Sequence, residues 1–223
     1  MVVGHDWGAP VAWHTALLRP DRVRGAVGLS VPFRGRGPAR PTEALARHFG
    51  PGHYILYFQP PGVADAELAA DPRATFRRLL SATSGGTSPL LPVVEPGTGL
   101  LDLMPEPEHL PAWLTEEDLD VYVDEYRGRG FTGGLNWYRN LDRSWALTAA
   151  WNGAPITRPA LFVAGEQDLV IAGVPADALV DALRGTLTDL RGATLLPGCG
   201  HWTQQERPEE VSAAIIGFAG DVS

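Results

Sequence analysis

The chain has 223 residues, 44% hydrophobic and 20% charged, a composition that provides one sizeable core. Its formal charge of −8, without any cluster of basic residues, argues against a nucleic-acid-binding surface. All 18 basic residues are arginines, and the lack of lysine excludes Schiff-base chemistry and a P-loop.

Cysteine usage and hydropathy bear on where the protein is found. Cys199 is the single cysteine, so no intrachain disulfide can form. The sequence has no signal peptide and no apolar span long enough to cross a membrane. We therefore expect a cytoplasmic protein with no membrane segment, and the sequence specifies no oligomeric state.

The first residues have the spacing of a nucleophile elbow, G-x-S-x-G, with Asp6 in place of the serine. Such an elbow joins a strand, here the short run 1–3, to a helix, here predicted from Pro10 to about Leu18. Because that strand is so short, the chain is expected to begin in the middle of a fold. An aspartate at this position can attack an sp³ carbon and form an ester of its own side chain. The predicted substrates are therefore epoxides or alkyl halides.

The next predicted elements form a parallel sheet. Residues 25–31 form a second buried strand, and two strands joined by a helix make a βαβ unit. Further strands are predicted at 159–165 and 193–196, with a helix over 177–183 between them and a last helix over 208–218. We predict an α/β core made of residues 1–33 and 151–223.

Residues 34–150 have scattered prolines and glycines and short helical stretches, and they are predicted to form a helical lid. Helices are expected over 65–80 and 115–127, and the second opens with a capping box at Thr115. The stretch from Pro89 to Pro111 has six prolines and no periodicity, so it is predicted to be a loop.

Two further polar residues follow strands of the predicted core. Asp168 comes after the strand 159–165, and His201 after the strand 193–196. Because ligands bind beyond the carboxyl ends of parallel strands, Asp6, Asp168 and His201 are expected at one edge of the sheet. Their order is that of a nucleophile, acid and histidine triad. His5 and His14 are expected to be structural, and Cys199 a packed loop residue.

Several sequence blocks resemble the epoxide hydrolases of the α/β-hydrolase fold, over nearly the whole chain. These blocks are Gly-His-Asp-Trp-Gly at 4–8, Ser-Val-Pro-Phe at 30–33, Tyr-Ile-Leu-Tyr-Phe-Gln at 54–59, Pro-Gly-Val-Ala at 61–64, Gly-Leu-Asn-Trp-Tyr-Arg-Asn at 134–140 and Gly-His-Trp-Thr-Gln at 200–204. The resemblance implies the C-terminal part of an α/β-hydrolase fold, a mostly parallel sheet with an inserted helical lid whose first strands are absent.

The resemblance also implies a two-step reaction. Asp6 attacks a ring carbon while Tyr54 and Tyr138 hydrogen-bond the epoxide oxygen, and His201, oriented by Asp168, then activates the water that hydrolyses the ester. The product is a vicinal diol, and no metal or organic cofactor is needed. Tyr57 is expected to be lid core instead. Two tryptophans complete the predicted site, Trp7 through its backbone N–H in the oxyanion hole and Trp137 near the substrate.

Two alternatives and one further expectation accompany this prediction. A haloalkane or haloacid dehalogenase shares the aspartate nucleophile, and Trp113, Asn136 and Trp137 are candidate halide donors. A non-catalytic relic that retained these residues is the other alternative. Because the second oxyanion donor belongs to a loop before the elbow, the chain alone is expected to be poorly soluble or inactive.

Overall fold

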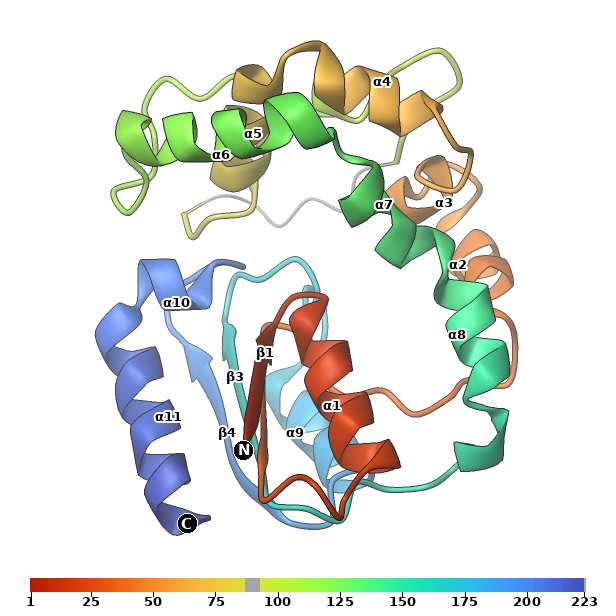
Figure 1. Ribbon diagram of the computed structural model, residues 1–223, viewed down its shortest axis with the longest axis vertical. Helices are drawn as coiled ribbons and strands as arrows, with labels where there is room; N and C mark the ends of the chain where they lie inside the picture. Colours follow the sequence, from red (N-terminus) through yellow and green to blue (C-terminus); the bar gives the residue numbers. More distant parts are fainter. Residues whose placement is uncertain (87–92, 223) are drawn as a thin grey trace. The chain divides into compact units, whose positions relative to one another are not determined.

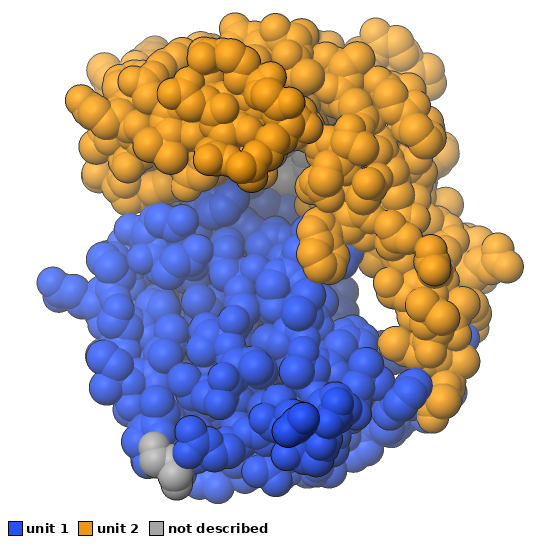
Figure 2. All heavy atoms as spheres, in the orientation of Figure 1, with its two compact units in different colours: residues 1–36, 83–89, 151–223 blue, residues 37–82, 90–150 orange. Residues whose placement is uncertain are grey.

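The computed structural model describes residues 1–86 and 93–222, which form two compact units (Figure 2). Unit 1 comprises Met1–Arg36, Thr83–Pro89 and Trp151–Ser223, and unit 2 comprises Gly37–Ala82 and Leu90–Ala150. Residues 83–86, which the sequence predicts to be part of the lid, belong to unit 1 instead. One reason is that Thr83 accepts a hydrogen bond from the backbone N–H of His201, at 2.9 Å.

Unit 1 is an α/β structure built on a parallel sheet, which confirms the predicted fold class. The four strands, in the order β1-β2-β3-β4, are β1 (Val2–His5), β2 (Ala26–Leu29), β3 (Ala160–Gly165) and β4 (Leu190–Leu196). Its helices are α1 (Gly8–Leu18), α9 (Ala176–Arg184), α10 (Thr203–Glu206) and α11 (Pro208–Asp221). Each predicted core element is present, with ends shifted by a few residues.

Helices cover both faces of this sheet, which explains why its central strands β2 and β3 are continuous apolar runs with every residue buried. Phe162 and its neighbours on one face pack against Trp13 of α1 and Leu183 of α9. Val163 and its neighbours on the other face pack against Phe218 of α11 (Figure 1). The result is a three-layer core with the carboxyl ends of all strands at one edge.

The outer strand β1 lacks part of this cover. Val3 pairs with Val27 of β2, which is fully buried, whereas Val3 itself is 43% exposed. Within the described residues β1 pairs only with β2, so its other edge presents backbone groups without a strand partner. An apolar strand with a free edge is a template for self-association.

We therefore expect the 223 residues expressed alone to self-associate, and Val3→Lys to reduce that association. The lysine places a charge on the exposed face and disfavours pairing with a second chain. Light scattering with size-exclusion chromatography measures the effect, and Val121→Lys, on an exposed helix of unit 2, is the control. A wild-type chain that is monodisperse would contradict the expectation.

Unit 2 is helical, as the sequence indicates. Its helices are α2 (Pro41–Phe49), α3 (Tyr54–Tyr57), α4 (Val63–Ala70), α5 (Pro72–Ala82), the short 3₁₀ turn η1 (Leu101–Leu103), α6 (Glu116–Arg129), α7 (Thr132–Arg139) and α8 (Leu141–Leu147), before a 3₁₀ turn η2 (Ala149–Trp151). The predicted capping box of α6 is confirmed, because Thr115 and Asp118 exchange side-chain to backbone hydrogen bonds of 3.1 and 3.0 Å.

Two expectations for this unit need correction. The single helix predicted over 65–80 is two helices, because Pro72 starts a new one and Asp71 caps it by accepting from the Ala74 N–H at 3.1 Å. The predicted loop 89–111 contains η1, and its residues 89–92 lie outside the described residues. Across the two described ranges, no helix has both the length and the apolarity needed to cross a bilayer.

Candidate active site

The elbow predicted around Asp6 is formed as the motif requires. Asp6 follows β1 directly and has a φ of 51°, a left-handed conformation that costs a non-glycine residue about 1–3 kcal/mol. Gly4 is needed because the start of α1 passes so close that a Cβ there would lie 1.9 Å from the carbonyl oxygen of Gly8. The backbone N–H of Trp7 donates to the Asp6 carboxylate. The strained turn thus presents a carboxylate at the start of α1.

The three predicted triad residues meet at the carboxyl edge of the sheet. His201 Nε2 lies 3.2 Å from Asp6 Oδ1, and His201 Nδ1 lies 3.1 Å from both oxygens of Asp168. Asp168 is fully buried and the side chain of Asp6 is 34% exposed. The imidazole therefore bridges a buried carboxylate and one that a small molecule can reach.

The backbone of His201 is fixed by two side chains from other strands. Its carbonyl oxygen accepts from Ser30 Oγ and from His5 Nε2, each at 2.7 Å. A carbonyl oxygen only accepts, so this contact requires the His5 proton on Nε2. Ser30 was not predicted as a site residue, although it follows β2 as Asp6 follows β1. The rule that found the triad, a polar residue at the end of a strand, would have found it.

The charges of the site are strongly coupled. Burial lowers the pKa of His201, but its hydrogen bonds to Asp168 and Asp6 outweigh burial and raise that pKa to about 10. Burial raises the pKa of Asp6, and the hydrogen bond from His201 overcomes it and lowers that pKa below its usual value. Burial also lowers the pKa of His5 and keeps it neutral. At neutral pH the free site holds an aspartate anion beside an imidazolium.

The two predicted lid tyrosines lie together in unit 2. Tyr54 begins α3 and Tyr138 lies in α7, and their ring centroids are 6.1 Å apart in an edge-to-face arrangement. Tyr57 differs from both, because its hydroxyl donates to Glu67 at 2.7 Å and its pKa is raised by burial and by that carboxylate. The helices of unit 2 thus place two phenol rings side by side, and the hydroxyl of the third ring is bonded to Glu67.

The comparisons with known proteins agree with this geometry. Residues 1–214 match the model of the alpha/beta hydrolase family. The chain is 46% identical over 220 residues to epoxide hydrolase A of Mycobacterium tuberculosis, covering 97% of this chain and 67% of that protein. The chain belongs to the epoxide hydrolases of the alpha/beta hydrolase family. It spans about two thirds of the length of the relatives it matches.

Solved structures of other epoxide hydrolases have the same fold. An epoxide hydrolase from an endophytic Streptomyces superposes with a TM-score of 0.93 at 47% identity, covering 99% of this chain and 67% of that one. Epoxide hydrolase A from Mycobacterium thermoresistibile superposes with a TM-score of 0.87 at 51% identity, covering 97% of this chain and 67% of that one. These values confirm the resemblance predicted from the sequence blocks.

The remaining predicted residues of this epoxide hydrolase chain are also located. Trp7 borders Asp6 at the start of α1, and Trp137 lies in α7 with half of its surface exposed. The His14 ring contacts the Pro10 carbonyl oxygen at 2.8 Å, which is a structural contact. Cys199 is fully buried, and burial raises the pKa of its thiol to about 12, so it is no nucleophile, as predicted.

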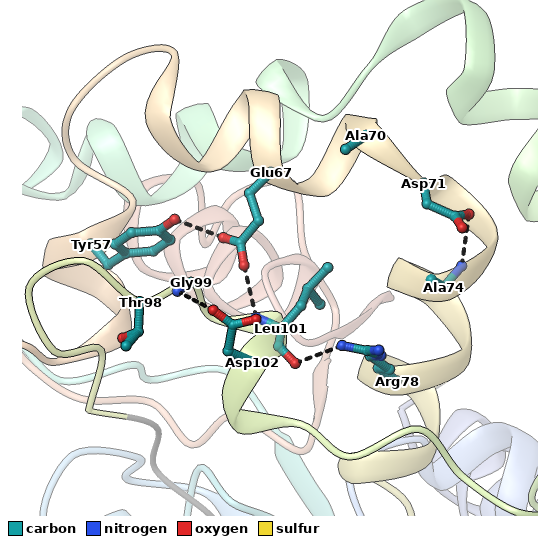
Figure 3. A pocket seen from close by; sticks show the side chains of 10 residues that line it. All are labelled: Tyr57, Glu67, Ala70, Asp71, Ala74, Arg78, Thr98, Gly99, Leu101 and Asp102. Atoms are coloured by element: carbon teal, nitrogen blue, oxygen red, sulfur yellow. Dashed lines mark hydrogen bonds between the residues drawn. The ribbon is translucent and has the colours of Figure 1, made fainter.

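A pocket of about 470 Å³ in unit 2 is a different feature from the predicted site (Figure 3). It is lined by residues of α3, α4, α5 and η1, and its central carboxylate, Glu67, is already bonded. Glu67 accepts from the hydroxyl of Tyr57 at 2.7 Å and from the N–H of Leu101 at 2.8 Å. These hydrogen bonds join α3, α4 and η1, so the Glu67 carboxylate holds three segments of unit 2 together.

Arg139 joins the segment of Tyr138 to two other segments of unit 2, α4 and the end of α3. Arg139, next to Tyr138, pairs with Asp65 of α4, and Arg139 Nε donates to the carbonyl oxygen of Phe58 at 2.9 Å. The side chains of Arg139 and Asp65 are only 10% and 18% exposed. The guanidinium holds the pKa of Asp65 well below its usual value.

We expect Arg139→Leu to lower the free energy of unfolding of unit 2 by about 1.5–3 kcal/mol. The substitution removes hydrogen bonds from Arg139 to a charged carboxylate and to a backbone carbonyl. Urea unfolding monitored by tryptophan fluorescence measures the change. Arg129→Leu in α6, whose pair with Glu125 is exposed, is the control and should cost about 0.5 kcal/mol or less. Equal effects of the two substitutions would show that the contacts of Arg139 with Asp65 and Phe58 do not stabilise unit 2.

Proposed function

We propose that the protein hydrolyses an epoxide to a vicinal diol through a covalent ester of Asp6. One observation carries this proposal: a buried imidazole joins a buried aspartate to a second aspartate at a nucleophile elbow. A carboxylate there attacks saturated carbon, whereas a serine would attack a carbonyl. The relatives named above are epoxide hydrolases, which agrees with this chemistry.

In the first step Asp6 attacks a ring carbon and the bond from that carbon to the epoxide oxygen breaks. The lowered pKa of Asp6 supports this role, since it keeps the carboxylate ionised at neutral pH. We assign to Tyr54 and Tyr138 the donation of a proton to the developing alkoxide, a base strong enough to take it from a phenol. The products are a hydroxyalkyl ester of Asp6 and a tyrosinate.

The change of charge on Asp6 prepares the second step. Because the ester carries no negative charge, one cause of the raised pKa of His201 disappears, and the imidazolium can return a proton through solvent to the tyrosinate. Neutral His201, oriented by Asp168, then takes a proton from water, which attacks the ester carbonyl. When the ester C–O bond breaks, the leaving alkoxide takes the second hydrogen of the attacking water and departs as the diol. Asp6 is restored as a carboxylate, and His201 is again an imidazolium.

Epoxides are favoured over halides by the lid. A ring oxygen needs proton donors, and two tyrosines in edge-to-face contact supply phenol groups close to one another. We propose a small-molecule epoxide and water as the substrates. Diol formation from styrene oxide with no halide release from chloroalkanes is the expected substrate pattern, and the reverse pattern would assign the protein to the dehalogenases.

A single turnover in water enriched in ¹⁸O tests the ester directly. With enzyme in excess over styrene oxide, the heavy oxygen should enter the Asp6 carboxylate and leave the first diol unlabelled, because water attacks the ester carbonyl. Mass spectrometry of the peptide that contains Asp6 and of the diol measures both. Label in the diol alone would mean that water adds directly to the epoxide and would overturn the proposal.

A further inference from the structure

The loop between β4 and α10, residues 198–202, holds His201 through its backbone. Three consecutive N–H groups in it are bonded: Gly200 donates to Glu206 Oε2 at 2.9 Å, His201 to the Thr83 carbonyl oxygen at 2.9 Å, and Trp202 to Glu206 Oε1 at 3.1 Å. Glu206 therefore binds the residue on each side of the histidine. Both carboxylate oxygens are used in doing so.

The same carboxylate reaches a second segment of the chain. Glu206 Oε2 also accepts from the N–H of Gly85 at 2.8 Å, and Thr83 Oγ1 accepts from Trp202 Nε1 at 2.7 Å. The two segments touch through backbone atoms, since a Cβ on Gly200 would lie 2.4 Å from the nitrogen of Gly85. The carboxylate thus joins residues 83–85, which follow directly on α5, to the loop that carries the histidine.

A helix cap by itself does not account for this arrangement. A glutamate in the first turn of α10 needs only one oxygen to accept from Trp202, the residue that precedes the helix. Here the other oxygen leaves the helix and binds Gly85 and Gly200 together. Three N–H groups converging on one half-buried carboxylate make charge-assisted bonds, which are the stronger kind.

We infer that Glu206 is a positioning residue for His201, which holds the imidazole where it can deprotonate the hydrolytic water. This inference rests on the proposed function, because it assigns Glu206 to the second step of that reaction. Glu206 binds the backbone N–H on each side of His201, and it acts on the imidazole through that backbone. Its loss therefore slows hydrolysis of the Asp6 ester and leaves formation of the ester by Asp6 intact.

Rapid-quench single turnovers with styrene oxide, followed by intact-protein mass spectrometry, separate the two steps. Glu206→Ala should slow ester hydrolysis by on the order of 10²-fold, the effect of a displacement of about 1 Å at a catalytic group, with the rate of ester formation unchanged. Glu206→Gln should cause a smaller loss, because its amide keeps one acceptor oxygen. Glu209→Gln, an exposed glutamate of α11 with the same change of charge, should leave both steps unaltered.

Four outcomes distinguish the explanations. If Glu206 matters only for folding, its loss lowers the amount of active enzyme. The ester yield then falls while both rate constants stay at their wild-type values. This result overturns the inference. Equal slowing of both steps overturns it as well. If His201→Gln accumulates the ester while Glu206→Ala hydrolyses it at the wild-type rate, only the role of Glu206 fails. If the wild type turns over styrene oxide and no ester is found in it or in either variant, the proposed function itself fails.

Discussion

Asp6→Asn is expected to abolish epoxide turnover, with a loss on the order of 10⁶-fold, the size found when a covalent nucleophile is removed. The amide has no charge with which to attack a ring carbon. Backbone strain is no confounding factor, because asparagine tolerates the left-handed conformation that Asp6 adopts at a φ of 51°. Diol formation from styrene oxide, measured by chromatography, checks the result. Asp21→Asn, an exposed aspartate, is the control and should retain activity.

The same substitution should change the titration of His201. Asp6 contributes both a hydrogen bond and a charge to the raised pKa of about 10, so its removal should lower that pKa toward the ordinary value of 6.5. An NMR titration of the imidazole in the wild type and in Asp6→Asn measures the shift. An unchanged pKa would mean that Asp168 alone keeps His201 protonated. Conversion of Asp6 to an ester would then not make His201 a base, contrary to the proposed second step.

His201→Gln should have the second large effect, trapping the enzyme halfway through its reaction. Asp6 can still attack the epoxide, but no base remains to activate water, so ester hydrolysis should slow by about 10²–10⁴-fold. Intact-protein mass spectrometry should find the enzyme heavier by one substrate molecule. His14→Gln, which changes a histidine bonded only within α1, should turn over normally. Loss of ester formation in His201→Gln would place the histidine in the first step instead.

The raised pKa of His201 also makes stability depend on pH. Its ion pairs contribute fully below the ordinary pKa of 6.5, and the contribution is lost as the pH rises toward about 10. The difference in free energy of unfolding between the wild type and His201→Gln should therefore shrink over that range. Urea unfolding at a series of pH values measures it, and a difference independent of pH would contradict a charged imidazole in the folded state.

The chemistry of the site was predictable from sequence because it depends on local patterns. The spacing around Asp6 specifies a strained turn between a strand and a helix, and polar residues directly after apolar strands must reach the carboxyl edge of a parallel sheet. These rules gave Asp6, Asp168 and His201 without any knowledge of distance. The break between α4 and α5 was missed, although Asp71-Pro72 is itself a local signal.

What surrounds the histidine was decided only by the tertiary structure. The position of Ser30 after a strand is a sequence signal, but its partner is not: Ser30 and Glu206 bind backbone groups 171 and 121 positions away in the chain, and no periodicity or spacing records such a contact. The protonation of His201 likewise arises only when two carboxylates from separate strands converge on one buried ring. The sequence alone determined which groups meet at this edge of the sheet and in what order they occur along the chain. The tertiary structure determined their charges and their support, because burial and long-range hydrogen bonds exist only after folding.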